Sequence, residues 1–265
     1  MRMPKQKVKE EQAQNFIKFL GTAGARFVMI KQLRASGGIW LCCQGTNILV
    51  DPGPGCIVRC ATSRPRLDPG KLDGIILTHR HLDHSGDVNV MIEAMTEGGF
   101  KKRGVVFCPE DTLGGDSVFL RYLLGFPEKF EILKPKSTYR LGNFEFSTSM
   151  PHIHPVTTLG LKFSIGNKRI SLITDTRYFP GLADFYKGSD IVIVAVVFLQ
   201  ERPGVDHLCL KDVEKIIELI RPEKTIMTHF GMTMLSAKPH LLAKDLSLRL
   251  GADVEAANDG MMLVF

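Results

Sequence analysis

The sequence predicts an α/β fold in which two β-sheets are covered on their outer faces by helices. Short apolar segments separated by turns recur along the chain, which carries 25 Gly and 14 Pro among its 265 residues. The first part is rich in such segments and poor in helical patterns, and the second part repeats that order with two helical patterns near its end. The sequence has no internal repeat, low-complexity tract or composition break, so we expect a single domain over residues 1–265.

The expected strands are short apolar or alternating runs bounded by turn residues. In chain order they are Asn15–Leu20, Arg26–Leu33, Ile39–Cys43, Asn47–Asp51, Gly74–Thr78, Gly104–Cys108, Phe130–Leu133, Phe144–Met150, Thr158–Ile165, Arg169–Thr174, Ile191–Val197, Thr225–Thr228 and Gly260–Phe265. Apolar residues recur at helical spacing in three segments, which are Asp87–Thr96, Leu210–Ile220 and Pro239–Leu250. These segments supply the helices that we expect outside the sheets.

The composition excludes several classes of protein. With 44% hydrophobic and 23% charged residues, the chain is not a disordered one. Its longest apolar run, Ile191 to Leu199, is about half of what a membrane span requires. The N-terminus is too acidic and too polar for a signal peptide, and the six cysteines form no CxxC pair. We therefore expect a cytoplasmic protein with reduced thiols, and its net charge of +6 permits an anionic substrate.

The strongest chemical signal is the segment Thr78-His79-Arg80-His81-Leu82-Asp83-His84, which follows a buried-strand pattern. In extended backbone, side chains two residues apart point the same way, so His79, His81 and Asp83 share one side. Three imidazoles and a carboxylate are costly to bury unless a cation compensates them. They are also ligands that zinc, iron and manganese accept, so the segment predicts a metal site.

The HxHxDH pattern after a strand that ends in Thr resembles the metallo-β-lactamase superfamily. Further matches follow along the chain: Asp51 in the turn DPG, His154 six residues before Gly160, Asp175 in SLITDT and His229 in TIMTHFG. The resemblance implies a four-layered αβ/βα sandwich of two mixed sheets with helices outside. We expect Asp51 to tie the following turn to neighbouring amides and so to support the metal loop from behind.

The resemblance also implies two divalent metal ions, with Zn²⁺ favoured and Mn²⁺ or iron as alternatives. It assigns the seven ligands in three sets: His79, His81 and His154 to one metal, Asp83, His84 and His229 to the other, and Asp175 between the two. His152 complicates this assignment, because in a strand it faces the same way as His154 and either could be the ligand. The distance to the following Gly favours His154, which leaves His152 beside the ligands or the substrate.

Such a site favours hydrolysis by a metal-bridging hydroxide that attacks phosphorus or a carbonyl carbon. Asp83 would orient that hydroxide and take its proton, as one of two expected catalytic residues. The other is His207, whose position before the helix at Leu210 resembles a histidine-bearing loop of the ribonuclease Z-like and phosphodiesterase-like branches. There it would protonate the leaving oxygen or bind the phosphate. The alternative is a histidine at a helix start that is hydrogen-bonded to backbone.

Two N-terminal segments, Phe19–Thr22 and Arg34–Gly38, resemble the openings of the ribonuclease Z-like and cyclic phosphodiesterase-like branches. They favour a phosphodiesterase acting on a small anionic substrate, such as a nucleotide or a short single-stranded RNA. Only twenty residues separate His154 from Asp175, which leaves no room for the long tRNA-binding arm of the tRNA-processing enzymes. The alternatives are a thioester or lactone hydrolase with the same metals and a non-catalytic metal-binding module. We expect a weakly held homodimer and no membrane association.

Overall fold

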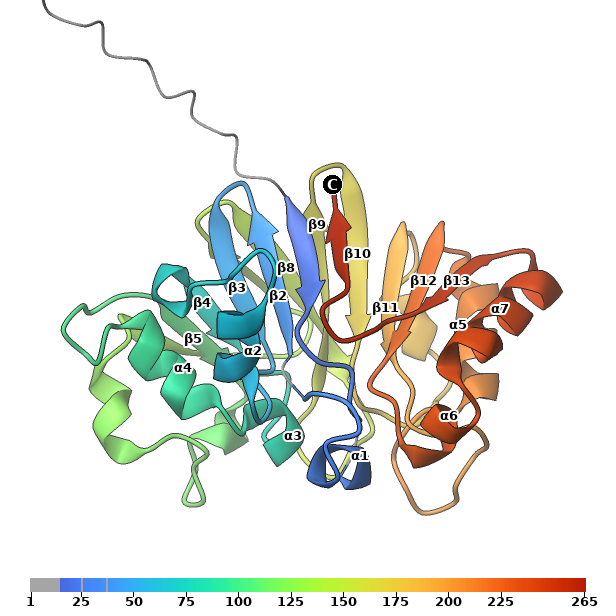
Figure 1. The fold of residues 1–265 in the computed structure, drawn as a ribbon, viewed down its shortest axis with the longest axis horizontal. Helices are drawn as coiled ribbons and strands as arrows, with labels where there is room; N and C mark the ends of the chain where they lie inside the picture. Colours follow the sequence, from blue (N-terminus) through green and yellow to red (C-terminus); the bar gives the residue numbers. More distant parts are fainter. Residues whose placement is uncertain (1–14, 25, 37) are drawn as a thin grey trace, which may run out of the picture.

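The computed structural model describes residues 15–24, 26–36 and 38–265, which form two seven-stranded sheets packed face to face (Figure 1). The first sheet has the strand order β14 (Met262–Val264), β1 (Phe16–Phe19), β2 (Ile39–Cys43), β3 (Thr46–Val50), β4 (Gly74–Ile76), β5 (Val105–Cys108) and β6 (Lys129–Ile132). The second has the order β13 (Asp253–Ala256), β12 (Lys224–Thr228), β11 (Ile191–Ala195), β10 (Lys168–Ile173), β9 (Leu159–Ile165), β8 (Phe144–Pro151) and β7 (Thr138–Leu141).

Both sheets are mixed, and they follow the same plan. Strands β14, β1, β2 and β3 pair antiparallel, whereas β3, β4, β5 and β6 pair parallel. In the second sheet, β7 to β10 pair antiparallel and β10 to β13 pair parallel. The carboxyl ends of parallel strands meet at one edge of a sheet, which is where loops carry ligand-binding residues.

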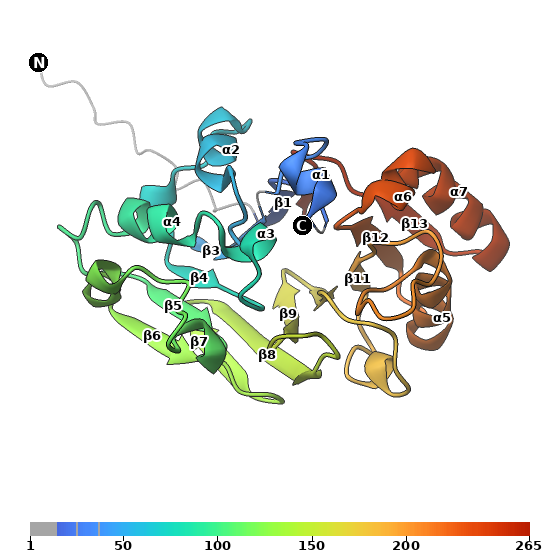
Figure 2. The same ribbon diagram turned by 90° about the horizontal axis from the view of Figure 1, so that it is seen from below.

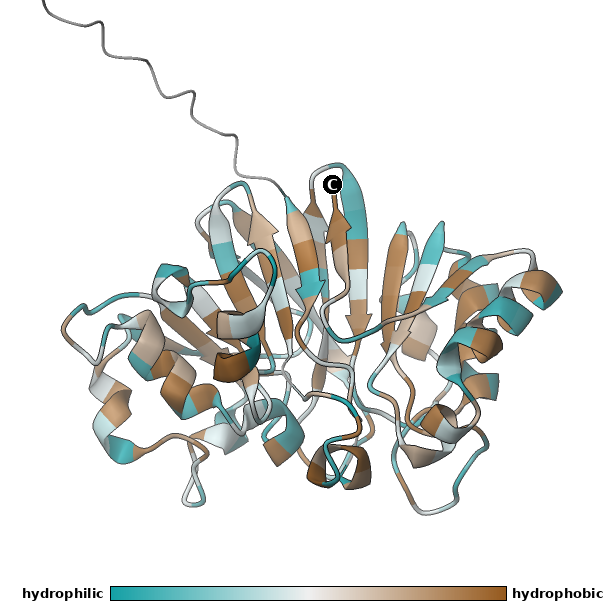
Figure 3. Ribbon diagram, viewed as in Figure 1, coloured by the Kyte–Doolittle hydropathy of each residue, from teal (hydrophilic) through white to brown (hydrophobic). Residues whose placement is uncertain are grey.

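The longer helices lie on the outer faces, as the sequence predicts, and the short helices after β1 and β4 lie at the edge where the two sheets meet (Figures 1 and 2). They are α1 (Phe27–Ile30), α2 (Cys56–Thr62), α3 (Leu82–Ser85), α4 (Val88–Met95), α5 (Leu210–Ile220), α6 (Met232–Ser236) and α7 (Pro239–Leu250), with 3₁₀ segments at Pro69–Lys71, Glu110–Thr112, Arg121–Gly125 and Leu182–Asp184. Helix α5 buries Val213, Ile216, Ile217 and Ile220 at helical spacing. The polar and apolar residues that alternate along α5 and α7 in Figure 3 are typical of such amphipathic helices.

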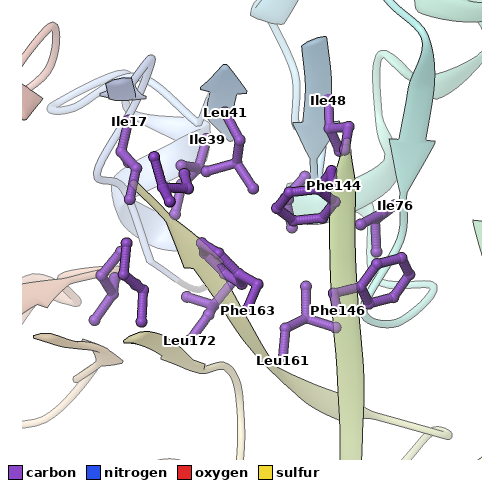
Figure 4. Packing of buried hydrophobic residues seen from close by; sticks show 14 of the residues in the cluster. Ile17, Ile39, Leu41, Ile48, Ile76, Phe144, Phe146, Leu161, Phe163 and Leu172 are labelled. Atoms are coloured by element: carbon purple, nitrogen blue, oxygen red, sulfur yellow. The ribbon is translucent and has the colours of Figure 1, made fainter. Parts of the chain in front are cut away.

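The main hydrophobic core lies between the two sheets (Figure 4). Inward-facing side chains of the first sheet, such as Ile17, Leu41 and Ile48, meet Phe144, Phe163 and others of the second. Two further clusters lie under the helices, one beneath α2 and α4 and one beneath α5 and α7. Strand β11 is buried along its whole length because it has strands on both sides and apolar clusters on both faces.

The expected strand at Arg26–Leu33 is wrong, because this segment contains helix α1. Its backbone makes helical bonds, from the Ile30 N–H to the Arg26 carbonyl and from the Lys31 N–H to the Phe27 carbonyl. Strand β1 is already flanked by β14 and β2, so the sheet offers the segment no free edge beside its predecessor. Of its apolar side chains only Val28 is fully buried, and Phe27, Ile30 and Leu33 are exposed.

The other expected strands and helices are present, with ends that differ by a few residues. The sequence analysis missed α2, β7 and β13 and the short helices α3 and α6. These elements are short or carry few apolar residues, so their local patterns are weak. Among the described residues, no helix is long and apolar enough to cross a membrane.

Candidate metal centre

The loop after β4 carries the HxHxDH segment to the edge where the two sheets meet. Thr78 and His79 are completely buried, and the chain then enters α3 at Leu82. The extended backbone that the sequence analysis assumed therefore ends at His81, and Asp83 comes from the first turn of α3. The helical turn nevertheless brings His84 and Asp83 to the same site, with His84 Nε2 3.6 Å from Asp83 Oδ2.

The remaining donors come from loops at the ends of other strands. Asp175 lies two residues after β10, His154 lies after β8, and His229 follows β12 directly. His229 has a left-handed backbone conformation, with φ of 61°. Gly24 packs against the carbonyl of His229, where an added Cβ would lie only 2.2 Å from the oxygen. The segment that contains Gly24, distant in sequence, therefore fixes the position of the backbone at His229.

Three groups of donor atoms form among the described residues; Asp175 belongs to two of them, and the third consists of Asp51, His79 and His84. The first consists of His79, His81, His154 and Asp175, and the second of Asp83, His84, Asp175 and His229. Within each group all donor atoms lie within 4.8 Å of one another. His79 Nε2 is 3.7 Å from Asp175 Oδ2, and His229 Nε2 is 3.2 Å from Asp175 Oδ1. Asp175 therefore lies between two sets of histidines.

The donor set fits divalent cations. Ten buried side-chain atoms of the described residues have no hydrogen-bond partner, and five of them belong to the two donor groups: His79 Nε2, Asp83 Oδ2, His84 Nε2, Asp175 Oδ1 and His229 Nε2. An unpaired buried polar atom costs about 1–3 kcal/mol, so five in one place are a large penalty. A cation accepts lone pairs from imidazole and carboxylate and would remove this penalty.

Burial keeps several of these histidines in the form that binds metal. It lowers the pKa of His79 well below its usual value, and it also lowers the pKa values of His81 and His154. A neutral imidazole has a free lone pair, whereas a protonated one has none. The histidines of the first donor group are therefore able to bind a metal at neutral pH. For His84, burial is outweighed by the carboxylates of Asp83, Asp51 and Asp175, which raise its pKa well above its usual value.

Asp51 orients the metal loop from behind. Its carboxylate accepts hydrogen bonds from the N–H and the hydroxyl of Thr78, both at 2.7 Å, and lies 3.0 Å from His84 Nδ1. The expectation that Asp51 supports this loop thus agrees with the geometry, although its partners lie on the loop itself rather than on the turn after Asp51. Fixing one ring nitrogen of His84 directs the other into the cluster.

The structure places His152 and His154 in different environments. Both ring nitrogens of His152 have partners, with Nε2 2.7 Å from the Tyr186 hydroxyl and Nδ1 3.2 Å from the Asp175 carbonyl. His154 Nε2 instead lies 3.0 Å from His81 Nδ1, inside the first donor group. His152 therefore braces the backbone of Asp175, and burial lowers its pKa to about 4.

Tyr186 is a site residue that the sequence analysis missed. It is fully buried and lies far along the chain from the HxHxDH segment. Gly160 packs closely against it, since an added Cβ at Gly160 would lie 1.8 Å from the Tyr186 hydroxyl. The sequence shows the glycine but does not indicate which distant side chain packs against it.

His207 also faces the cluster. Its Nδ1 lies 3.7 Å from Asp175 Oδ2, and its ring packs against that of His154 with centroids 5.1 Å apart. The ring belongs to neither of the two donor groups. His207 therefore lies beside the proposed metal ligands without being one of them, and it is available for another role at the site.

A β-lactamase superfamily domain model matches residues 46–230, from β3 past His229. The chain belongs to the β-lactamase superfamily. The uncharacterized protein MJ1374 of Methanocaldococcus jannaschii is 30% identical over 255 residues, which cover 92% of each protein. The family membership confirms the resemblance drawn from the HxHxDH segment.

Two solved structures share the fold. The metallo-β-lactamase fold protein YhfI of Bacillus subtilis has a TM-score of 0.78 at 19% identity and covers 95% of this chain and 100% of its own. A diphosphatase from the PhnP family has a TM-score of 0.71 at 19% identity and covers 95% and 97%. The αβ/βα sandwich is thereby confirmed. Together with the donor cluster, the family supports a metal-dependent hydrolase that binds divalent metal.

Proposed function

We propose that the site holds two divalent metal ions, with Zn²⁺ favoured over Mn²⁺ or iron. The observation that carries this proposal is the division of the donors into two groups that share Asp175. His79, His81 and His154 would hold one ion, Asp83, His84 and His229 the other, and Asp175 would bridge them. Imidazole nitrogen and carboxylate oxygen suit all three metals, and zinc accepts this mixture most readily.

The proposed reaction is hydrolysis of a phosphodiester in a small or single-stranded substrate. Divalent cations at these positions would supply Lewis acidity and an activated water. Asp83, at the edge of the second donor group, would orient that water and accept its proton. His207, whose Nδ1 lies 3.7 Å from Asp175 Oδ2, would donate a proton to the leaving oxygen. The net charge of +6 and the likeness to a diphosphatase support a phosphate-containing substrate.

A second candidate is hydrolysis of a thioester or lactone. A small pocket of about 50 Å³ adjoins Asp83, His84 and His229, and its lining also includes the apolar residues Ile39, Val50, Leu172 and Ala195. An apolar wall suits an acyl group better than a phosphate. The apolar lining of this pocket is therefore the observation that favours a thioester or lactone substrate.

Parallel assays on the metal-loaded protein separate the two candidates. We expect hydrolysis of bis(p-nitrophenyl) phosphate at a higher kcat/KM than that of a thioester. The reverse order would replace the proposed function by the carbonyl hydrolase. Activity on neither would favour a metal-binding module, and metal content measured by mass spectrometry would then show whether the ions are present.

Replacing His154 and His152 separately tests the ligand assignment. We expect His154→Ala to lose the metal of the first donor group, because its Nε2 lies within that group. We expect His152→Ala to keep both metals at saturating concentration, because its nitrogens are engaged by Tyr186 and the Asp175 backbone. Metal content after gel filtration is the measurement. Full metal retention in the His154 variant would contradict the assignment.

Replacing His207 tests its role as the acid. In His207→Ala we expect both metals to remain and the hydrolysis of a phenyl phosphodiester to slow by about 100-fold, the usual contribution of a general acid. The p-nitrophenolate leaving group needs less protonation, so bis(p-nitrophenyl) phosphate should lose much less. An equal loss with both substrates would exclude proton donation to the leaving oxygen.

A further inference from the structure

A second pocket, of about 280 Å³, lies apart from the metal centre against the first sheet. It is lined by Lys18, Leu20, Arg59, Thr62, Ser63, Arg64, Asp259 and Gly260. These residues come from β1, the end of α2 with the turn that follows, and the turn before β14. Because Ile17 and Phe19 on β1 face the core between the sheets, Lys18 faces the outer side, which α2 covers.

The central feature of this pocket is the buried ammonium group of Lys18. The residue is only 4% exposed, and its Nζ donates to the carbonyls of Arg64 at 2.9 Å and Gly260 at 3.2 Å. No carboxylate of the described residues lies within 4.0 Å of Nζ. Burial lowers the pKa of Lys18, which shows that the surroundings disfavour its charge. A buried charge of this kind is costly unless an anion offsets it.

Further hydrogen-bond donors lie around Lys18. Arg59 donates from Nε to the Leu20 carbonyl, and its nearest carboxylate oxygen, on Asp259, is 3.9 Å away. The Ser63 hydroxyl is buried and has no hydrogen-bond partner among the described residues. Arg64 is exposed at the rim of the pocket. The lining therefore includes three positively charged residues, and a buried hydroxyl without a partner belongs to a neighbouring residue.

The one carboxylate in the lining is already engaged elsewhere. Asp259 Oδ1 accepts from the N–H and the hydroxyl of Thr22, at 2.9 and 2.7 Å, and Oδ2 accepts from the Ala35 N–H at 2.8 Å. These bonds direct its oxygens toward the loop after β1. With Lys18, Arg59 and Arg64 opposed by this single acid, the lining carries an excess of two positive charges.

We propose that this pocket binds a phosphate group. A phosphate offers several charged acceptor oxygens, which suits a pocket whose lining includes one lysine, two arginines and a single acid. The group could belong to a small phosphorylated compound or to the backbone of a single-stranded nucleic acid. None of the lining residues belongs to the metal donor groups, so the site does not depend on the proposed function.

The test compares a double variant with a control of equal charge. Arg59→Gln with Arg64→Gln removes two guanidinium groups that line the pocket, whereas Arg66→Gln with Lys71→Gln removes two exposed charges outside it. Calorimetric titration of the metal-loaded protein with inorganic phosphate is the measurement. We expect the pocket variant to bind one phosphate about ten-fold more weakly and the control to match the unaltered protein. Both should hydrolyse bis(p-nitrophenyl) phosphate within about two-fold of the unaltered rate.

Phosphate binding that is unchanged in the pocket variant, or equally weakened in the control, would overturn the proposal. Lys18→Met should show the same loss, and if it fails to fold the arginine variant still decides. A labelled five-nucleotide RNA distinguishes the two sources of phosphate. Weaker RNA binding in the pocket variant would identify a nucleic-acid backbone as the ligand, and unchanged RNA binding with weaker phosphate binding would identify a small phosphorylated compound.

Discussion

Asp175→Asn is expected to lose metal from both donor groups and to reduce hydrolysis by about a thousand-fold or more. Asp175 is the one residue that belongs to both groups, and its two carboxylate oxygens lie 3.2 to 4.0 Å from nitrogens of His229, His84, His79 and His154. Asparagine keeps the shape but replaces an anionic oxygen with an NH₂ group, which has no lone pair for a metal. Losing the shared ligand therefore weakens both positions at once.

Metal content by mass spectrometry and the rate on bis(p-nitrophenyl) phosphate measure this prediction. Asp184→Asn is a suitable control, because Asp184 lies in a 3₁₀ segment between β10 and β11 and pairs only with Lys187 near the surface. We expect the control to keep its metal and its rate. If Asp175→Asn kept both metals at full occupancy, Asp175 would not be the bridging ligand, and the two groups would have to bind metal independently.

The HxHxDH segment was the part of the site that the sequence predicted most directly. Its ligands lie within six residues after a buried strand, so the local pattern alone brings them together. His154, Asp175 and His229 are distant in sequence, and only their order and their positions after strands connected them to the segment. Parallel strands of one sheet align their carboxyl ends, which brings the residues after β10 and β12 to one edge. The loop after β4 belongs to the other sheet and meets them there because the two sheets pack face to face.

The failures have a common physical origin in tertiary contacts. The segment Arg26–Leu33 has the apolar content of a strand, but strand formation needs a free sheet edge, and β1 already has two neighbours. Tyr186 and His152 form a hydrogen bond between side chains 34 residues apart, which no local pattern encodes. The preference for His154 over His152 is not one of these failures, but the engagement of the ring nitrogens that distinguishes the two residues is likewise encoded by no local pattern.

The turn after β3 lies in close contact with the metal loop, and Gly53 is the residue that makes this contact possible. An added Cβ at Gly53 would lie 1.9 Å from the Ser36 carbonyl oxygen and 2.1 Å from the Asp83 carbonyl oxygen. Both are backbone atoms, so no side-chain rotation can relieve the overlap. Asp83 belongs to the second donor group, so any movement that accommodates a methyl group displaces a proposed ligand.

We therefore expect Gly53→Ala to lower the free energy of unfolding by about 3 kcal/mol, the upper part of the usual cost of overpacking, and to weaken metal binding at the second group. For a chain of this size that corresponds to a fall in Tm of roughly 6–12 °C. Thermal unfolding of the metal-loaded protein and metal titration measure the two effects. Gly115→Ala is the matched control, because its Cβ would meet no atom within 4 Å. Equal stability of the two variants would show that the turn and the metal loop move apart without cost, and Gly53 would then have no part in positioning Asp83.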